Sequence, residues 1–480
     1  MELLIILISL FTAALIGISV RHRRIFEAFS VAASAVAFVE SVVVSLKVAS
    51  TGSYAPYSFF YVDALGAIVM LIIACVGFAV TVYSVEYLRQ ETAKKVIGFT
   101  RVKQYFVLLD LFIAAMFLAV TASSPIVTWI SIEATTLSTA FLISFYNKPS
   151  AMEAAWKYLI INSIGLLLGF FGTLLYFIPL NPLQGSGLVT WQLLAANTAH
   201  FDPLIARIAF VFVLIGYGTK AGLVPMHTWL PDAHSKAPAP ISALLSGVLL
   251  NVAFVVILRF KGITDAVVGS SFSQGFLVLF GIISMLVAAM IILTQTNYKR
   301  LLAYSSIENM GIVSLGFGFG GLGAFAAILH MIYHALVKST LFLSAGTVLL
   351  KYSSTKIARV TGVLTALTVT GILFLTGFFF ITGTPPFGIF LTKIFILSAG
   401  IKTHPVVTLV ALFSMAVLFI GFFKHVTDMF FGKKPEGIQA DEGSVWLVVP
   451  PLVLIAVAFY LSFHIPGFLF TLIKTAVSHS

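Results

Sequence analysis

Charged residues are scarce in this 480-residue chain, at 9% of the sequence, and cysteine occurs only once. A soluble domain carries about a quarter charged residues, so this chain lacks the charge to cover a globular surface. It is also too long for one soluble core without dividing into domains. These shortages exclude a soluble enzyme, a nucleic-acid-binding protein and a disordered protein. The single cysteine, Cys75, excludes a disulfide framework and a cysteine-ligated cluster within the chain.

Apolar residues make up 60% of the sequence and fall in long runs separated by short polar breaks. Many runs reach about eighteen residues, the length that spans a bilayer as a helix. A membrane β-barrel would instead show alternating segments of about ten residues. The sequence therefore predicts an all-α polytopic protein embedded in a lipid bilayer. We expect fourteen spans, at about residues 1–20, 25–48, 58–84, 102–122, 125–146, 152–178, 204–229, 237–260, 273–295, 300–320, 322–350, 362–400, 405–431 and 445–475.

Two of these spans are expected to be broken helices. The twelfth is too long for one straight helix across about 30 Å of hydrocarbon, and it contains Pro385 and Pro386. Proline lacks an N–H donor and clashes with the preceding turn, so the helix must break there. Gly222 and Pro225 interrupt the seventh span in the same way. Non-helical backbone at membrane depth persists only where it is buried in protein or lines a wet cavity.

Basic residues set the expected orientation. Of the 28 Lys and Arg residues, 18 lie in or beside the odd-numbered loops, and six lie in even-numbered loops or the C-terminal tail. Basic residues favour the cytoplasmic side, so both termini are expected outside a cell membrane. The loop at about 179–203 has no Lys or Arg, which agrees. The net charge of +11 therefore reflects topology and predicts no nucleic-acid partner.

The first segment has Glu2 near its start and no basic stretch. We therefore expect it to be the first span and not a cleaved signal peptide. Spans four to eight and nine to thirteen form two sets of five, and an odd number inverts the second set relative to the first. Each set has a proline-broken fourth helix with one lysine, Lys220 or Lys393, a pattern that points to an ion path near the midplane. The predicted divisions are 1–101, 102–262, 263–431 and 432–480.

Ionisable residues inside the spans need an explanation, because a charge at the bilayer centre costs at least about 2.5–3.5 kcal/mol. Glu133 lies in the fifth span and Lys220 in the seventh. A neighbouring carboxylate and ammonium support each other's charge, so moving one changes the proton affinity of the other. Such a pair works as a switch; the alternative is a static structural ion pair.

His330, His334 and Lys338 lie at four-residue intervals in the eleventh span, which places all three on one helix face. Histidine passes protons through its two nitrogens, so these residues predict a proton relay supported by water. Structural histidines and a metal site are the alternatives, although no carboxylate accompanies the histidines in the metalloprotease pattern. Lys393 is expected to be the last relay before the outside, unless it reaches to the membrane interface as a snorkelling lysine.

Three further residues are weaker candidates for the path or its entrance. Glu153 and Lys157 form an i,i+4 pair at the start of the sixth span, where a surface pair is an equal alternative. Glu308, near the start of the tenth span, is placed on the entrance route.

Other charged residues and motifs give weaker evidence about function. Asp110 in the fourth span is expected to face a neighbouring subunit. Three polar residues after the seventh span are expected to be solvated: Asp232, His234 and Lys236. The chain shows no haem, flavin or nucleotide motif, so we expect no bound cofactor and no metal.

The longest distinctive segment runs from Lys220 to His234 and reads Lys-Ala-Gly-Leu-Val-Pro-Met-His-Thr-Trp-Leu-Pro-Asp-Ala-His. It resembles the signature of the antiporter-like subunits of respiratory complex I, of Mrp-type cation/proton antiporters and of energy-converting hydrogenases. The resemblance continues through four more segments: Ala237–Phe260, Leu301–Ser306, His334–Lys338 and Leu341–Gly346. It covers nearly the whole chain, and the motif around Lys220 is long and specific.

The resemblance implies roles for individual residues. The family's proton-path positions fall on Glu133, Lys220, His330, His334, Lys338 and Lys393. One departure is Asn251, where the family often has Lys or His; a neutral amide binds a relay water but cannot itself be a protonated station. Three segments look most like the membrane component F of hydrogenase-4-type enzymes: Glu133–Leu137, Glu153–Tyr158 and Ile307–Gly311.

The sequence and its resemblance together predict a proton-translocating subunit of a multi-subunit hydrogenase, formate hydrogenlyase or complex I-like assembly. This subunit would itself perform no redox chemistry. Its expected partners are other membrane-arm subunits and soluble redox subunits that carry iron–sulfur centres, including a nickel–iron hydrogenase. One alternative is a Na⁺/H⁺ antiporter subunit of an Mrp-type assembly. Another is a structural membrane-arm subunit that does not pump.

Overall fold

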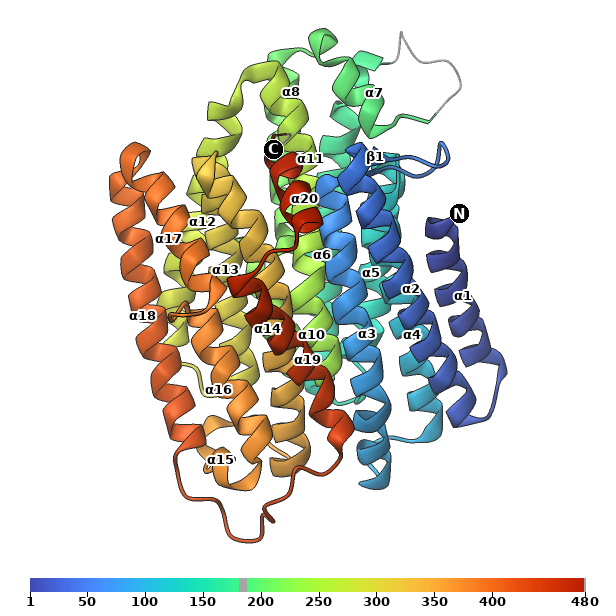
Figure 1. The fold of residues 1–480 in the computed structure, drawn as a ribbon, viewed down its shortest axis with the longest axis vertical. Coiled ribbons are helices and arrows are strands. Elements are labelled where there is room, and N and C mark those ends of the chain that lie inside the picture. Colours follow the sequence, from blue (N-terminus) through green and yellow to red (C-terminus); the bar gives the residue numbers. More distant parts are fainter. Residues whose placement is uncertain (181–187, 479–480) are drawn as a thin grey trace.

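The computed structural model describes residues 1–180 and 188–478, and this part of the chain is mostly helical (Figure 1). Twelve of its helical segments are long and apolar enough to cross a membrane, judged by length and composition. The sheet found in the described part has two short antiparallel strands, β1 (Ser53–Tyr54) and β2 (Val62–Asp63). The predicted all-α polytopic membrane fold is confirmed.

The helices divide naturally at residue 269. Those before it are α1 (Glu2–Ser19), α2 (Arg23–Thr51), α3 (Ala64–Ala93), α4 (Phe99–Thr121), α5 (Pro125–Ile143), α6 (Pro149–Leu175), η1 (Ile178–Leu180), α7 (Trp191–Ala196), η2 (Thr198–His200), α8 (Pro203–Ala221), η3 (Met226–Thr228), α9 (Trp229–Lys236), α10 (Ala239–Leu244), η4 (Leu245–Leu249) and α11 (Leu250–Val268). Those after it are α12 (Ser270–Ile292), α13 (Tyr298–Phe319), α14 (Leu322–Tyr352), η5 (Ile357–Arg359), α15 (Val363–Ala366), α16 (Thr368–Thr382), α17 (Gly388–Thr403), α18 (Pro405–Phe430), η6 (Val445–Leu447), α19 (Val449–Phe463) and α20 (Gly467–Ser478).

Each of the fourteen predicted spans corresponds to one helix or to a consecutive series of helices. The two that are not among the twelve apolar segments are α13 and the broken pair α16–α17. Several boundaries were wrong. Helix α3 continues to Ala93, and the seventh span continues through α9 to Lys236. The last span is two helices, because Pro466 lies between α19 and α20 and cannot continue the first of them. Part of the predicted 179–203 loop, residues 181–187, lies outside the described residues.

Both predicted helix breaks are confirmed, and each one closes on a glycine. Gly222 ends α8 with φ +78°, and its N–H donates to the Thr219 carbonyl. Gly383 ends α16 with φ +82°, and its N–H donates to the Phe380 carbonyl. This left-handed conformation is easy only for glycine, which is why the two helices stop at these residues.

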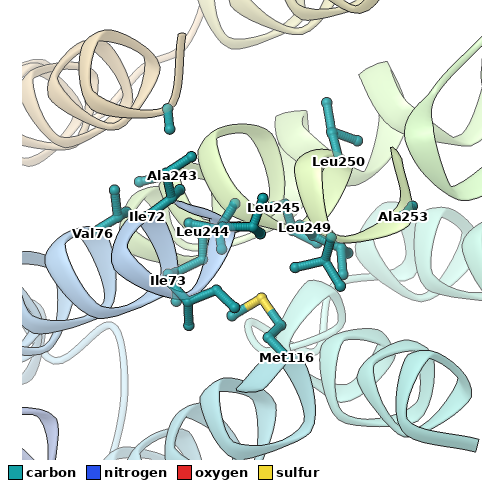
Figure 2. Close-up of a cluster of buried hydrophobic side chains, with 14 of the residues drawn as sticks. Ile72, Ile73, Val76, Met116, Ala243, Leu244, Leu245, Leu249, Leu250 and Ala253 are labelled. Carbon is teal, nitrogen blue, oxygen red and sulfur yellow. The ribbon is translucent and has the colours of Figure 1, made fainter. Parts of the chain in front are cut away.

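A further irregularity was not predicted. Between α10 and α11 the chain makes one π-helical turn, η4. Leu244, Leu245 and Leu249 are fully buried here, and Figure 2 shows them beside Ile72 and Ile73 of α3. Because a π turn holds an extra residue, it rotates the side chains that follow relative to a regular helix. Such turns occur often at functional sites.

Helices α10–α11 and α14 form the interior of the molecule. Every residue in the most apolar window of each segment is buried. Helix α14 contacts α3, α10, α13, α16, α17 and α19. In Figure 1, α1 and α18 lie at opposite edges of the bundle, and each has a large share of exposed apolar residues. Polar residues on α14 therefore face other helices and not lipid. The division into two inverted five-helix repeats stays a prediction.

Close packing of α6 on α8 depends on glycines that face each other. A methyl group at Gly216 would overlap the backbone of Gly169. We therefore expect Gly216→Ala to destabilise the protein by about 1–3 kcal/mol, the usual cost of overpacking. Thermal unfolding of the detergent-solubilised protein measures this. Gly275→Ala on α12 is the matched control: no atom lies within 4 Å of the added carbon, so an equal loss there would contradict the packing argument.

Candidate functional site

Lys220 is fully buried in the last turn of α8, directly before the helix break. Its Nζ donates hydrogen bonds to Thr136 Oγ1 at 2.8 Å and to the Tyr158 hydroxyl at 2.7 Å. The same Nζ lies 4.8 Å from the centre of the Tyr158 ring. An ammonium group buried this deeply requires hydrogen-bond acceptors, and α5 and α6 supply them. The break lets α8 end at this point with a side chain directed between two neighbouring helices.

Glu133 does not form the direct pair with Lys220 that the sequence suggested. Its Oε1 accepts a hydrogen bond from Ser163 Oγ at 2.8 Å, and its Oε2 has no hydrogen-bond partner among the residues that the structure describes. Among residues 1–180 and 188–478, no ion pair joins Glu133 to Lys220. The two charges interact only across a longer distance. Hydroxyl groups, and not the carboxylate, are therefore the direct partners of Lys220 in this conformation.

A second group of buried polar residues joins α13, α14 and α17. Lys338 of α14 donates to the Leu302 carbonyl at 2.7 Å and also to Ser305 Oγ, both on α13. The carbonyl of Ser305 accepts from Asn309 Nδ2 at 2.6 Å. Asn309 Oδ1 in turn lies 2.9 Å from His330 Nε2. The contacts therefore run without interruption from Lys338 to His330.

The same network continues to an ion pair. Asn309 Nδ2 also donates to Glu308 Oε2 at 2.7 Å. Glu308 Oε1 lies 3.2 Å from Lys393 Nζ. His330 Nδ1 lies 2.9 Å from Thr392 Oγ1, the neighbour of Lys393 on α17. Glu308 is fully buried and Lys393 is 5% exposed, so this charge pair lies inside the protein.

One prediction about this group was wrong, and one alternative is contradicted. Glu308 does not lie near the start of its helix but midway along α13. The alternative that Lys393 snorkels to an interface fails, because its ammonium contacts Glu308 and the Ile381 and Thr382 carbonyls at the end of α16. The break in the twelfth span exposes those carbonyls, so the broken helix itself supplies acceptors to the lysine.

The three predicted residues of α14 are all fully buried, but they have different surroundings. His330 and Lys338 both contact α13, as the shared face predicts. His334 lies between them, and among the described residues neither of its ring nitrogens has a hydrogen-bond partner. Buried polar groups are nearly always hydrogen-bonded, so both nitrogens of His334 are available to a further donor or acceptor.

Asn251 is fully buried one residue into α11, just after the π turn. Its Nδ2 donates to the Gly247 carbonyl at 2.9 Å and to the Met331 carbonyl at 3.4 Å. Within the described part of the chain, its Oδ1 has no hydrogen-bond partner. Met331 follows His330 on α14, so Asn251 lies beside α14 with one acceptor still available. That Asn251 holds a relay water stays a prediction.

The end of the bundle where α3 and α9 end and α6 and α13 begin is called the lysine-rich face, and it carries Lys94, Lys148, Lys236 and Lys299. Other charges on it form a separate cluster. Lys157 pairs with Glu153 at 2.6 Å, and their side chains are 50% and 64% exposed. Asp232 of α9 lies 3.6 Å from Lys157 and 2.5 Å from Arg300 of α13. Glu153 and Lys157 therefore make the surface pair that was one of the two predictions for them. The prediction that Asp232 is simply solvated was wrong, because it connects α6, α9 and α13.

Two other predictions fail because the side chains are buried. His234 was expected in solvent, but it is fully buried with its ring stacked on Phe342 at 4.8 Å. Asp110 was expected to face a neighbouring subunit. It is 1% exposed and accepts a hydrogen bond from Ser30 of α2 at 2.6 Å. Both errors arise because a sequence does not show which neighbouring helix covers a polar residue.

Sequence reasoning missed several residues of the site. Thr136, Tyr158, Ser305, Asn309 and Thr392 all contact the predicted lysines and histidines. All five are polar residues within apolar runs, and all but Thr392 lie in segments that carry the family resemblance, although the resemblance assigned them no role. Polarity by itself is a weak signal, because hydroxyl groups in membrane helices commonly bond to their own backbone.

The fold and these buried charges define a helical membrane protein with ionisable groups in its interior. Residues 122–419 match the family described as "NADH:quinone oxidoreductase/Mrp antiporter, TM", and residues 49–95 match "NADH-Ubiquinone oxidoreductase (complex I), chain 5 N-terminus". The chain is 36% identical over 395 residues to the hydrogenase-4 component F homolog of Methylacidiphilum infernorum (isolate V4), covering 82% of this chain and 83% of that protein. The chain therefore belongs to the NADH:quinone oxidoreductase/Mrp antiporter family, as the resemblance indicated.

More distant relatives are longer proteins. A Na⁺/H⁺ antiporter subunit of Alkalihalophilus pseudofirmus is 26% identical over 87% of this chain, which spans only 54% of that protein. Two solved structures share the fold. A chain of the membrane-bound sulfane sulfur reductase, an archaeal respiratory membrane complex, superposes with a TM-score of 0.85 at 23% identity, over 100% of this chain and 96% of that one. A chain of the Mrp complex from Dietzia sp. DQ12-45-1b gives 0.84 at 19% identity, over 99% and 96%.

Proposed function

We propose that this chain translocates protons across a cell membrane as a non-redox subunit of a multi-subunit energy-converting complex. One observation carries the proposal: a continuous series of buried contacts leads from Lys338 through Asn309 to the Glu308–Lys393 ion pair. Charges in the membrane interior are costly, and they usually mark ion pathways or proton relays. The lysines, the histidines and the glutamate each bind and release a proton, so the series can carry one.

The proposed path has two parts. The first contains Glu133 and Lys220, whose charges interact over a longer distance. The second is the network on α13, α14 and α17, and it includes His330, His334 and Lys338. Asn251 and water connect the two parts near α14. Lys393 releases the proton on the side opposite the lysine-rich loops, and Glu308 holds the proton before Lys393. Glu153 and Lys157 remain candidates for an entrance to the first part.

The orientation follows from the distribution of basic residues. The loops with most Lys and Arg lie at one end of the bundle, which carries α15 at the bottom of Figure 1. This end is the cytoplasmic one under the positive-inside rule. Both chain ends lie toward the other end, together with α7, and would face outside.

The host complex is proposed from the relatives. The hydrogenase-4 component F homolog is more similar in sequence to this chain than the Na⁺/H⁺ antiporter subunit is, and it is similar in length. We therefore propose membrane-arm partner subunits and soluble redox subunits of a hydrogenase, formate hydrogenlyase or complex I-like assembly, with iron–sulfur centres on the soluble side. Copurification of the tagged chain from its native membrane, followed by mass spectrometry, identifies these partners. Recovery of the chain by itself would contradict membership in a complex.

A direct test of the function uses the purified complex in sealed vesicles with a pH-sensitive dye. We expect turnover of the complex to move protons in sodium-free buffer. The second candidate function is Na⁺/H⁺ exchange, and the match to a Na⁺/H⁺ antiporter protein favours it. In that case proton movement would require Na⁺ and would follow an imposed sodium gradient without redox turnover. Turnover without any proton movement would contradict both functions.

The hydroxyl of Tyr158 gives a prediction specific to this structure. Tyr158→Phe removes one of the two hydrogen-bond acceptors of Lys220. A hydrogen bond to a charged group contributes about 1.5–3 kcal/mol. We therefore expect proton transport to slow by about tenfold or more, since about 1.4 kcal/mol is a tenfold effect. Tyr217→Phe is the matched control, because that buried tyrosine of α8 makes only a 3.4 Å contact with Thr173. Equal rates for both variants would contradict the assigned contact.

A further inference from the structure

A polar pocket of about 370 Å³ opens on the lysine-rich face and contains none of the residues assigned above to the proton path. It lies where α3, α9 and α14 end and where α6 and α13 begin. Four lysines line it: Lys94, Lys148, Lys236 and Lys299. One carboxylate, Glu91, lies among them. A pocket with so many charged groups differs from the apolar clefts that bind lipid tails.

Glu91 is buried, at 5% exposure, and has one oxygen available. Its Oε1 accepts a hydrogen bond from the Tyr146 hydroxyl at 2.5 Å, whereas its Oε2 has no hydrogen-bond partner in the described ranges 1–180 and 188–478. Burial and the nearby Glu91 charge raise the pKa of Tyr146 well above its usual value. The phenol therefore stays a donor near neutral pH and orients the carboxylate. Glu91 can then accept a proton on the second oxygen.

Lys299 forms the inner wall of the same pocket. It is 1% exposed, and its Nζ donates to the Ala237 carbonyl at 2.6 Å. Lys299 lies in the first turn of α13, and Leu302 follows one turn later, about 4.5 Å along the axis. The Leu302 carbonyl is the acceptor for Lys338. One turn of α13 therefore separates Lys299 in the pocket wall from the carbonyl group that binds Lys338.

His234 lies near the surroundings of both lysines. It is fully buried one turn before Ala237, which accepts from Lys299, and its ring stacks at 4.8 Å on Phe342 of α14. Within residues 1–180 and 188–478, neither of its ring nitrogens has a hydrogen-bond partner. It interacts electrostatically with both Lys299 and Lys338. A buried histidine with two available nitrogens, close enough to interact with both lysines, is suited to accept a proton on one nitrogen and release it from the other.

We propose that this pocket is a proton-uptake site that supplies the α13–α14–α17 network from the lysine-rich face. Glu91 accepts a proton from water, Lys299 and His234 pass it inward, and Lys338 receives it. Each step moves one proton between oxygen or nitrogen atoms and needs no oxidant or reductant. The inference rests on the proposed function and adds an entrance that is separate from Lys220. In this proposal turnover needs both entrances, so loss of either Lys220 or Glu91 stops most of the transport.

The charges around the pocket favour a proton over a metal cation. Four ammonium groups and one carboxylate give a local excess of positive charge, which repels Na⁺. Burial and the neighbouring Lys351 lower the pKa of Lys94, so that this lysine releases a proton more easily than a solvated one. A proton is not repelled in the same way as Na⁺, because it is transferred only to a group that is neutral at that moment.

The test uses the assembled complex in sealed vesicles and two variants of the pocket. Glu91→Gln removes the accepting carboxylate. Ser150→Trp places a bulky ring at the exposed rim without changing a titratable group. We expect both to slow proton uptake by tenfold or more. The control is Glu86→Gln, the same change on the same helix at a carboxylate that contacts Gln90 and does not line this pocket. Wild-type uptake in both pocket variants would overturn the proposal.

A second measurement does not depend on transport. A water-soluble carbodiimide adds to accessible protonated carboxyl groups, and peptide mass spectrometry locates the adduct. We expect modification at Glu91 from the lysine-rich face, with strong protection by Ser150→Trp. Absence of the adduct in the unchanged complex would contradict the uptake role. Lys220→Ala and Lys393→Ala distinguish failure of the proposed function from failure of the uptake site. If both variants still transport protons, the proposed function is contradicted. If both lose transport while Glu91→Gln transports normally, only the uptake site is contradicted.

Discussion

Replacing Lys220 with alanine should abolish proton transport by the assembled complex. The ammonium is fully buried and directed to Thr136 and Tyr158, so its removal deletes the titratable group from the first part of the path. The alanine variant still satisfies the hydroxyl groups, because Tyr158 retains its 2.5 Å contact with Thr139. We therefore expect the complex to assemble and to lose at least 95% of its transport (about 1.8 kcal/mol). Initial rates in sealed vesicles with a pH-sensitive dye measure the loss.

Lys402→Ala is the matched control for that experiment. Lys402 is an exposed lysine near the end of α17 and has no partner role in the buried networks described above. Its loss should leave transport unchanged. Normal proton movement in the Lys220→Ala complex, with assembly confirmed by size-exclusion chromatography, would exclude Lys220 from the path.

Glu308→Gln should reduce both the stability and the transport of the protein. The change leaves the buried ammonium of Lys393 without its carboxylate partner at 3.2 Å. Removing one member of a buried ion pair costs about 3–5 kcal/mol, because the other charge is left uncompensated. The same change removes the proton acceptor between Asn309 and Lys393. Thermal unfolding in detergent measures the first effect, and vesicle transport measures the second.

The double variant Glu308→Gln/Lys393→Met separates structure from function at this pair. Replacing both charges with neutral side chains often restores stability, since no unpaired charge remains. We expect the unfolding midpoint to return toward that of the natural protein while transport stays absent. Restored transport in the double variant would show that the ion pair is only structural. A midpoint that stays as low as in the single variant would contradict the assigned pairing.

The features that could be predicted from the sequence are those fixed by local chemistry. Long apolar runs give the spans, and glycine and proline give the breaks at Gly222 and Gly383. A spacing of four residues puts His330, His334 and Lys338 on one helix, and that helix is in the interior. These properties need no knowledge of which helices are neighbours.

The partners of each side chain could not be predicted, because they come from distant parts of the chain. Glu308 and Lys393 are 85 residues apart, and Lys220 is 84 residues from Thr136. His234 follows a polar stretch that is typical of a solvated loop, but Phe342 of α14 covers it. The only glycine or proline within the π turn before Asn251 is Gly247. The turn packs against α14 and α3, which are distant in the sequence.

The polarity of α13 has a consequence for biosynthesis. This helix carries Lys299, Arg300 and Glu308 and is not among the segments apolar enough to cross a membrane by length and composition. Moving charged residues from the translocon into lipid is unfavourable. We therefore expect α13 to leave the translocon only together with a partner helix. Helices α12 and α14 both pack on it and are the partners made just before and just after it. The network that we propose for proton transfer therefore also requires that neighbouring helices enter the bilayer as a group.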